Sequence, residues 1–410
     1  MNVRSRISSL IDSQKFLGYL LALILSTLLL GFAPASIAVG IFVFFSIRYA
    51  IINRQKQPID FKLLLPIALY LLFVSSLFWT VDGAQTLKGL GRTVVLLLIP
   101  VAFNLIPKFT SKSFNLIFKF FTNVNIIIGV FFLVTAIIRY LQSSFLDVFT
   151  YHDLVSSLEL NAIYVSLVFS MSLFYLLSKQ TKSSLDIIKI IFFITLEILL
   201  SSKIMLFVLT LSPLVYLILY GINNLKLLSL IILGTIFIAL GSKIPLDRFL
   251  FEKETKVKEV WTNNEFGHVY MWTGTSIRLL QLRILKDQIK DEGIFWRGFG
   301  LYASRNNIKQ RHMEFDTYPG FHDYNYHNQY AQILAETGII GLALLLSILG
   351  VLFGSSINSR NYLFIMFSFT ITLLFFSETL LWRQSGLFLF IILYCLLNRT
   401  IFPNKLFISN

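Results

Sequence analysis

The feature that most constrains this chain is a run of about twenty apolar residues that recurs along its length. A run of that length crosses the hydrocarbon core of a bilayer as one helix. Only 14% of the residues are charged and 56% are hydrophobic, whereas a soluble domain has about a quarter charged residues. The sequence therefore predicts an all-α polytopic membrane protein of about twelve transmembrane helices. The runs lie near 16–33, 35–52, 63–79, 87–106, 114–138, 160–178, 185–201, 203–220, 225–241, 332–353, 361–378 and 384–401.

The basic residues between these runs predict the orientation, because Lys and Arg in short loops resist translocation. With a cytoplasmic N-terminus, seventeen basic residues fall in inside segments and five in short outside segments. We therefore expect both termini in the cytoplasm. Ala33-Pro34-Ala35 resembles a signal-peptide cleavage site, but the second run starts there, which favours an uncleaved anchor.

One long polar segment, residues 242–328, follows the ninth run and is expected on the periplasmic side. Its thirteen basic residues are nearly balanced by acidic ones. The net charge of +14 thus belongs to the cytoplasmic face, where it meets anionic lipid rather than nucleic acid. We predict transmembrane spans one to nine in 1–241, the periplasmic loop with the active site in 242–328 and spans ten to twelve in 329–410.

Within this loop, residues 276–292 have helical periodicity, and a broad apolar arc includes Ile277, Leu280 and Ile284. Arg278 falls inside that arc, where a guanidinium needs an anionic partner. Two explanations stay open. Arg278 pairs with a nearby carboxylate or extends its head to water, or it binds phosphate with its planar donor fork. The preceding stretch 251–265 has no periodicity and is expected to lie on the membrane surface.

Other residues of the loop allow several roles. Gly298-Phe299-Gly300 is typical of a turn, and its backbone amides are accessible to a ligand. The tyrosines of 301–326 either stack on sugar rings or cover the loop's own core. His322 and His327 are five residues apart, a spacing that does not share a helix face, so we expect no metal site. The single cysteine, Cys395, excludes an intrachain disulfide and a Cys-based zinc site.

The most informative string runs from Tyr324 through His327-Asn328 to Glu336-Thr337-Gly338 and Gly341. Asn325 is a good N-cap, which would place His327 in the first turn of the helix that leads into span ten. The helix dipole there lowers the pKa of a histidine. A neutral imidazole at the membrane boundary accepts a proton from a hydroxyl. Taken alone, a histidine in a first turn also serves a structural role.

Several pieces of the chain together resemble the O-antigen ligase and polymerase superfamily, which comprises membrane glycosyltransferases of bacterial polysaccharide assembly. The strongest are Gly298-Phe299-Gly300 and the His327-to-Gly341 block. Lys203 stands where the family usually has Arg, so the charge is kept but the bidentate fork is lost. The weaker pieces are the turn 76–82, Leu200-Ser201-Ser202-Lys203 and Ser276-Ile277-Arg278.

The resemblance implies an inverting, metal-independent transfer without cofactor, from an undecaprenyl-diphosphate-linked glycan to a sugar hydroxyl on the periplasmic side of the inner membrane. It implies His327 as the base and Arg278 as the cation at the diphosphate. The weaker substrate-binding candidates are Lys203, Arg297, Arg305 and Asn328. The acceptor is either lipid A core, for a ligase, or a second lipid-linked glycan, for a polymerase. Glycosylation of a protein acceptor stays open as a third case.

Two other classes of function stay open. A transporter or flippase for lipid-linked sugars would line its path with intramembrane charges. A structural membrane partner would make the loop's His and Arg residues incidental. Ionisable residues inside the runs are few, notably Glu197 and Glu378, while the polar residues concentrate in one outer loop. This distribution favours the enzyme.

Overall fold

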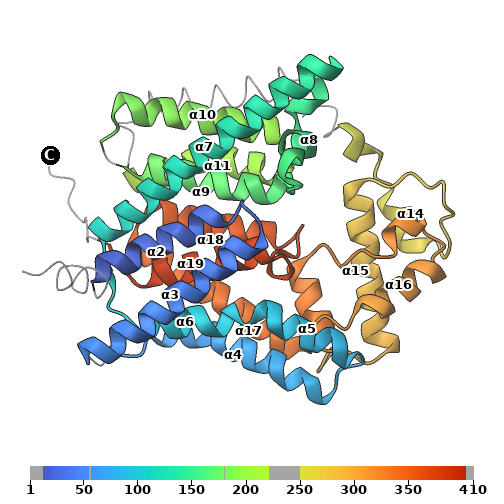
Figure 1. Cartoon of the computed structure of the whole chain (residues 1–410). Helices are drawn as coiled ribbons and strands as arrows, with labels where there is room; N and C mark the ends of the chain where they lie inside the picture. Colours follow the sequence, from blue (N-terminus) through green and yellow to red (C-terminus); the bar gives the residue numbers. More distant parts are fainter. Residues whose placement is uncertain (1–12, 55–56, 180, 221–249, 403–410) are drawn as a thin grey trace, which may run out of the picture.

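A computed structural model describes residues 13–54, 57–179, 181–220 and 250–402. In this part of the chain nearly every regular element is a helix, and two short strands, β1 (Phe109–Thr110) and β2 (Thr400–Ile401), pair in parallel. The apolar helices form the larger body of the molecule (Figure 1). They are α2 (Gln14–Thr27), α3 (Phe32–Asn53), α4 (Leu64–Ser75), α5 (Gly83–Thr93), α6 (Val95–Leu105), α7 (Ser111–Ser143), α9 (Ala162–Ser178), α10 (Ser184–Leu200), α11 (Lys203–Tyr220), α17 (Gln329–Ser359), α18 (Tyr362–Leu374) and α19 (Gln384–Asn398).

Among the described residues, six helical segments are long and apolar enough to cross a membrane. The number rises to seven if the bent pair of Tyr151–Leu158, which begins with α8 (Tyr151–Val155), and α9 counts as one span. α2, α18 and α19 are shorter apolar helices of ten to seventeen residues. Helices thus occupy eleven of the twelve predicted runs, and the run 225–241 lies outside the described residues. The all-α membrane class is confirmed, whereas the count of twelve spans stays a prediction.

Buried polar contacts join neighbouring helices inside the bundle. The carboxylate of Glu197 on α10 is fully buried and accepts hydrogen bonds from Ser166 and Ser170 of α9. Asn125 of α7 donates to Ser172 of α9 over 2.7 Å. A polar group in an apolar interior is costly unless it is hydrogen-bonded. Glu197 therefore links two helices, and both of its oxygens are engaged within that pair.

The segment after α11 that is described, residues 250–328, forms a smaller body beside the bundle (Figure 1). Its helices surround a second hydrophobic core that includes Val260, Leu280, Ile284, Phe299 and Ile308. Ala331 and Ala335, in the first turns of α17, belong to this same core. The loop is therefore folded and fixed to one end of the bundle. Its elements are η6 (Glu252–Glu254), α14 (Val257–Thr262), α15 (Gly274–Asp291), α16 (Arg305–Glu314) and η7 (Pro319–Phe321).

The glycine pairs of the sequence mark the contact between this loop and α17. Phe299 N donates to Ala335 O and Gly300 N donates to Glu336 O, each over 2.8 Å. A Cβ on Gly298 would lie 2.3 Å from the carbonyl carbon of Glu336, and one on Gly338 would lie 2.2 Å from Trp296 O. Both glycines have positive φ, and Gly338 interrupts the helical geometry of α17. The two strings thus pack backbone against backbone.

The turn 76–82 closes the same junction from the first half of the chain. Val81 N donates to Phe299 O over 2.9 Å, and Leu301 N donates to Ser76 Oγ over 3.2 Å. Trp79 Nε1 donates to Arg297 O over 2.8 Å. Gly298-Phe299-Gly300 is therefore a structural turn in which all three amides and the carbonyls of Phe299 and Gly300 already have partners.

Candidate functional site

Arg278 is positioned by α15, which begins close to the predicted start of the helix. Thr273 caps it through a reciprocal capping box with Ser276, a common helix start. Ile277, Leu280 and Ile284 are buried, as the apolar arc predicted. Arg278 lies in the first turn beside them, with its side chain 32% exposed. The helix thus presents a half-buried guanidinium at the edge of the bundle.

The guanidinium of Arg278 has three partners. Nε donates to Ser377 O over 3.1 Å, Nη1 donates to Gly274 O over 2.9 Å, and Nη2 lies 3.3 Å from Glu378 Oε1. Glu378 is buried in the turn between α18 and η8 (Leu380–Trp382). The anionic partner expected from the sequence is present, and it fixes the direction of the fork.

Lys203 begins α11, across from Arg278, after the tight turn that joins α10 to α11. Its Nζ lies 2.7 Å from Oε1 of Glu252, and Oε2 of Glu252 accepts a hydrogen bond from Thr275 N over 3.0 Å. Burial opposes ionisation of Glu252. The bonds from Lys203 and Thr275, with the charge of Lys203, outweigh it and lower the pKa of Glu252 to about 2. The carboxylate is therefore ionised at neutral pH.

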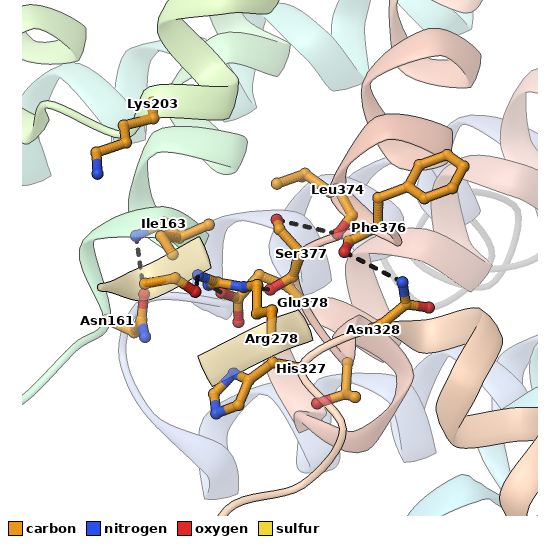
Figure 2. A network of polar contacts seen from close by, with 12 residues as sticks. Asn161, Ile163, Lys203, Arg278, His327, Asn328, Leu374, Phe376, Ser377 and Glu378 are labelled. Carbon is orange, nitrogen blue, oxygen red and sulfur yellow. Dashed lines mark hydrogen bonds and ion pairs between the residues drawn. The ribbon is translucent and has the colours of Figure 1, made fainter. Parts of the chain in front are cut away.

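Lys203 and Arg278 line one cavity of about 690 Å³. Tyr151, Ile163, Glu252 and Ser377 are among its other lining residues. Figure 2 shows Lys203 on its helix on one side of the group, with Arg278, Ser377 and Glu378 together opposite it. The fold thus brings together two cations that are 75 positions apart in the sequence. A cavity with two fixed cations is suited to an anionic ligand.

His327 lies next to Arg278 (Figure 2), but its position differs from the prediction. α17 begins at Gln329, and Asn328 is its N-cap, with its side chain accepting from Ala331 N over 2.9 Å. His327 therefore precedes the helix rather than occupying its first turn, and its backbone has φ 44°. Asn325 does not cap a helix. Its side chain accepts from His327 N over 2.8 Å and donates to Thr379 Oγ1 over 2.7 Å.

The imidazole of His327 is neutral, as predicted, but the cause is burial and neighbouring positive charge rather than the helix dipole. Burial lowers its pKa to about 4, and the positive charges of Arg278 and Arg383 add to this effect. The ring packs edge-on against Tyr324, with 5.0 Å between the ring centroids. Nδ1 is buried and has no hydrogen-bond partner among the described residues. The result is a neutral, proton-accepting ring beside a cation.

Asn328 has a structural role in this arrangement. Besides capping α17, its side-chain amide donates to Phe376 O over 3.2 Å, and Figure 2 shows it pointing toward Phe376. Both ends of the amide are thus engaged within the protein. The prediction that Asn328 contacts substrate is not favoured by this geometry. Its contacts instead fix the His327 turn to the turn that carries Ser377 and Glu378.

Arg297 and Arg305 lie apart from this cavity. The Arg297 side chain is exposed on the turn that packs against α17. The guanidinium of Arg305 lies over the ring of Trp382 at 5.4 Å and lines a second, smaller cavity of about 190 Å³. The structure therefore brings Arg278, Lys203 and His327 together, and leaves these two weaker candidates outside.

Two other histidines of the loop, His312 and His322, form a separate pair. His312 is buried, its Nδ1 lies 3.1 Å from Thr317 Oγ1, and its ring lies 6.4 Å from that of His322. Among the described residues, no group of three or more His, Cys, Asp or Glu side chains has an arrangement that could hold a metal ion. The tyrosines of the loop differ in burial. Tyr302 and Tyr326 are buried, whereas Tyr318 and Tyr324 are exposed.

Glu252 and Glu378 are the site residues that sequence reasoning missed. Glu378 stands out in the sequence as an acidic residue within an apolar hairpin, but nothing local identifies Arg278 as its partner. The stretch 251–265 was expected to lie on the membrane surface, which stays a prediction, and the structure shows that part of it packs within the protein. Val260 is in the loop's core and Glu252 lines the cavity. The segment consists of two short helices, so it shows no long periodicity.

These features define a helical membrane protein with a cavity between its bundle and a folded loop, lined by two cationic side chains. The comparison with protein families identifies it further: the family described as O-Antigen ligase matches residues 161–346. This match confirms the resemblance to the O-antigen ligase superfamily. The match includes Lys203, Arg278 and His327, while the turn 76–82 lies outside it. No curated protein matches the chain.

Proposed function

We propose that this protein transfers a glycan from an undecaprenyl-diphosphate-linked donor to a sugar hydroxyl at the periplasmic face of the bacterial inner membrane. The observation that carries the proposal is the cavity lined by both Lys203 and Arg278, with the neutral ring of His327 beside Arg278. The family match over residues 161–346 supports a membrane glycosyltransferase of the O-antigen ligase type.

The cations suit the leaving group. As the glycosidic bond breaks, negative charge accumulates on the diphosphate, and fixed cations directed at that charge stabilise the transition state. The fork of Arg278 is already oriented by Ser377 and Glu378, so little reorganisation is needed at the moment of reaction. Lys203 supplies a second positive charge from the opposite side of the cavity. No metal ion is required for this role.

His327 suits the attacking hydroxyl. A neutral imidazole accepts the proton as the acceptor oxygen attacks the anomeric carbon. One direct displacement inverts the configuration of the transferred sugar. Donor binding also improves the base, because a diphosphate offsets the positive charge of Arg278 that depresses the pKa of His327. The base thus becomes stronger when the substrate it serves is present.

The acceptor is either lipid A core, for a ligase, or a second lipid-linked glycan, for a polymerase. A deletion strain separates these cases when its surface glycan is resolved on a gel. Complete loss of long chains from lipid A indicates a ligase, and lipid A carrying single repeats indicates a polymerase. An unchanged glycan profile in the deletion strain would count against both.

A further inference from the structure

The carboxylate of Glu252 occupies the space where the two cations would meet a ligand. Oε1 lies 2.7 Å from Lys203 Nζ, and Oε2 accepts from Thr275 N at the start of α15. Glu252 lines the cavity together with these residues. An internal anion therefore holds Lys203, one of the two cations that we assign to the diphosphate.

Arg278 is close to the same carboxylate. A Cβ built on Gly274 would lie 3.0 Å from Glu252 Oε1 and 3.2 Å from Arg278 Nη1. The two atoms are consequently no more than about 6 Å apart. An opposite charge at that range stabilises a charged group. Glu252 thus offsets the positive charge of Lys203 directly and that of Arg278 in part, while Glu378 pairs with Arg278 from the other side.

We propose that Glu252 is an internal counter-ion that the donor must displace, and that it makes the cavity selective for a diphosphate over singly charged phospholipid headgroups. The inference rests on the proposed function. A phosphodiester carries one negative charge, as the carboxylate does, so exchanging one for the other gains little binding free energy. A diphosphate carries more negative charge and accepts more hydrogen bonds, so its binding compensates for displacing Glu252. The membrane holds anionic phospholipids in large excess, so a cavity without Glu252 would be occupied by them.

Glu252→Gln tests the inference because it keeps the shape and hydrogen-bonding oxygen of the side chain but removes its charge. Binding of undecaprenyl diphosphate to the purified full-length protein in detergent is measured, with phosphatidylglycerol as competitor. We expect about fivefold tighter binding of undecaprenyl diphosphate, the upper range for the loss of one partly exposed ion pair. Phosphatidylglycerol should compete well with undecaprenyl diphosphate for the variant and poorly for the wild type. The matched control is Glu259→Gln, because Glu259 is an exposed partner of Lys256 in the same loop. This variant should change neither the affinity for undecaprenyl diphosphate nor the competition by phosphatidylglycerol.

A double variant separates this role from a structural brace. In Lys203→Ala the Glu252 carboxylate still repels the donor, so adding Glu252→Gln should restore part of the lost affinity. If Glu252 only ties the loop to the bundle, Glu252→Gln instead weakens donor binding and lowers the Tm, and it does not restore the affinity of Lys203→Ala. That result would show that the inference is wrong. A wild type that binds undecaprenyl diphosphate and transfers glycan, with no tightening in Glu252→Gln, overturns this inference alone. A wild type that neither binds nor transfers overturns the proposed function.

Discussion

Replacing Arg278 by Lys separates a guanidinium fork from a plain positive charge. In the structure, Arg278 makes three directed contacts, to Ser377 O, Gly274 O and Glu378. An ammonium is a point charge on a flexible stem and does not reproduce that fork. Removing one preorganised donor to a developing anion costs about 10²–10³ in rate. We therefore expect Arg278→Ala to lose about that factor, and Arg278→Lys to stay within about tenfold of the Ala variant.

The assay is turnover of a lipid-linked donor by purified protein, with thermal unfolding measured in parallel. The loss of a hydrogen bond to a charged group costs about 1.5–3 kcal/mol, so both variants should also unfold at lower temperature. Activity is compared well below the unfolding transition, which separates catalysis from folding. Recovery of most of the activity in Arg278→Lys would reduce the residue to a source of charge. Full activity in Arg278→Ala would refute the diphosphate clamp.

Three further predictions concern topology, packing and pH. A cysteine at exposed Asn306, on the predicted outer side, should react with an impermeant reagent in intact cells, and one at exposed Asn358, on the predicted cytoplasmic side, should not. The native Cys395 is buried and should give little background labelling. The reverse labelling pattern would contradict the predicted orientation. Gly298→Ala should lower the free energy of unfolding by about 1–3 kcal/mol or more, because its φ of +68° and the backbone of α17 leave no room for a Cβ; an unchanged Tm would contradict that packing. Because the pKa of His327 is about 4, kcat/KM should stay constant as the pH falls from 7 to 5 and should decline toward pH 4, where the base gains a proton. A decline centred above pH 6 would contradict the burial of the ring.

The sequence predicted what depends on local pattern. The apolar arc of α15 identified both the helix and the arginine that lies on its buried side. It also required an anion near Arg278, because a guanidinium there is costly without one. The anion is Glu378, which lies a hundred residues away in the sequence. Only the packing of the loop against the bundle decides it.

The errors in the site have equally local causes. Asn325 and Asn328 are both suitable N-caps, and the sequence does not decide between them. Tertiary contacts do, because Asn325 binds Thr379 while Asn328 caps α17 and reaches Phe376. The glycines were expected to form a turn, and the structure shows that their freedom is used there for close backbone contact between the loop and α17. Glu252 has no signal beyond its charge.

The most direct test of the proposed mechanism is single-turnover transfer by His327→Gln, with binding of undecaprenyl diphosphate measured on the same preparation. Glutamine keeps a hydrogen-bonding side chain but does not act as a base. Removal of a general base costs about 10²–10⁴ in rate, so transfer should slow at least a hundredfold while binding stays within a few-fold of wild type. His322→Gln, in the neighbouring histidine pair, is the matched control and should retain much more activity. Transfer by His327→Gln at close to the wild-type rate would contradict the assignment of His327 as the base.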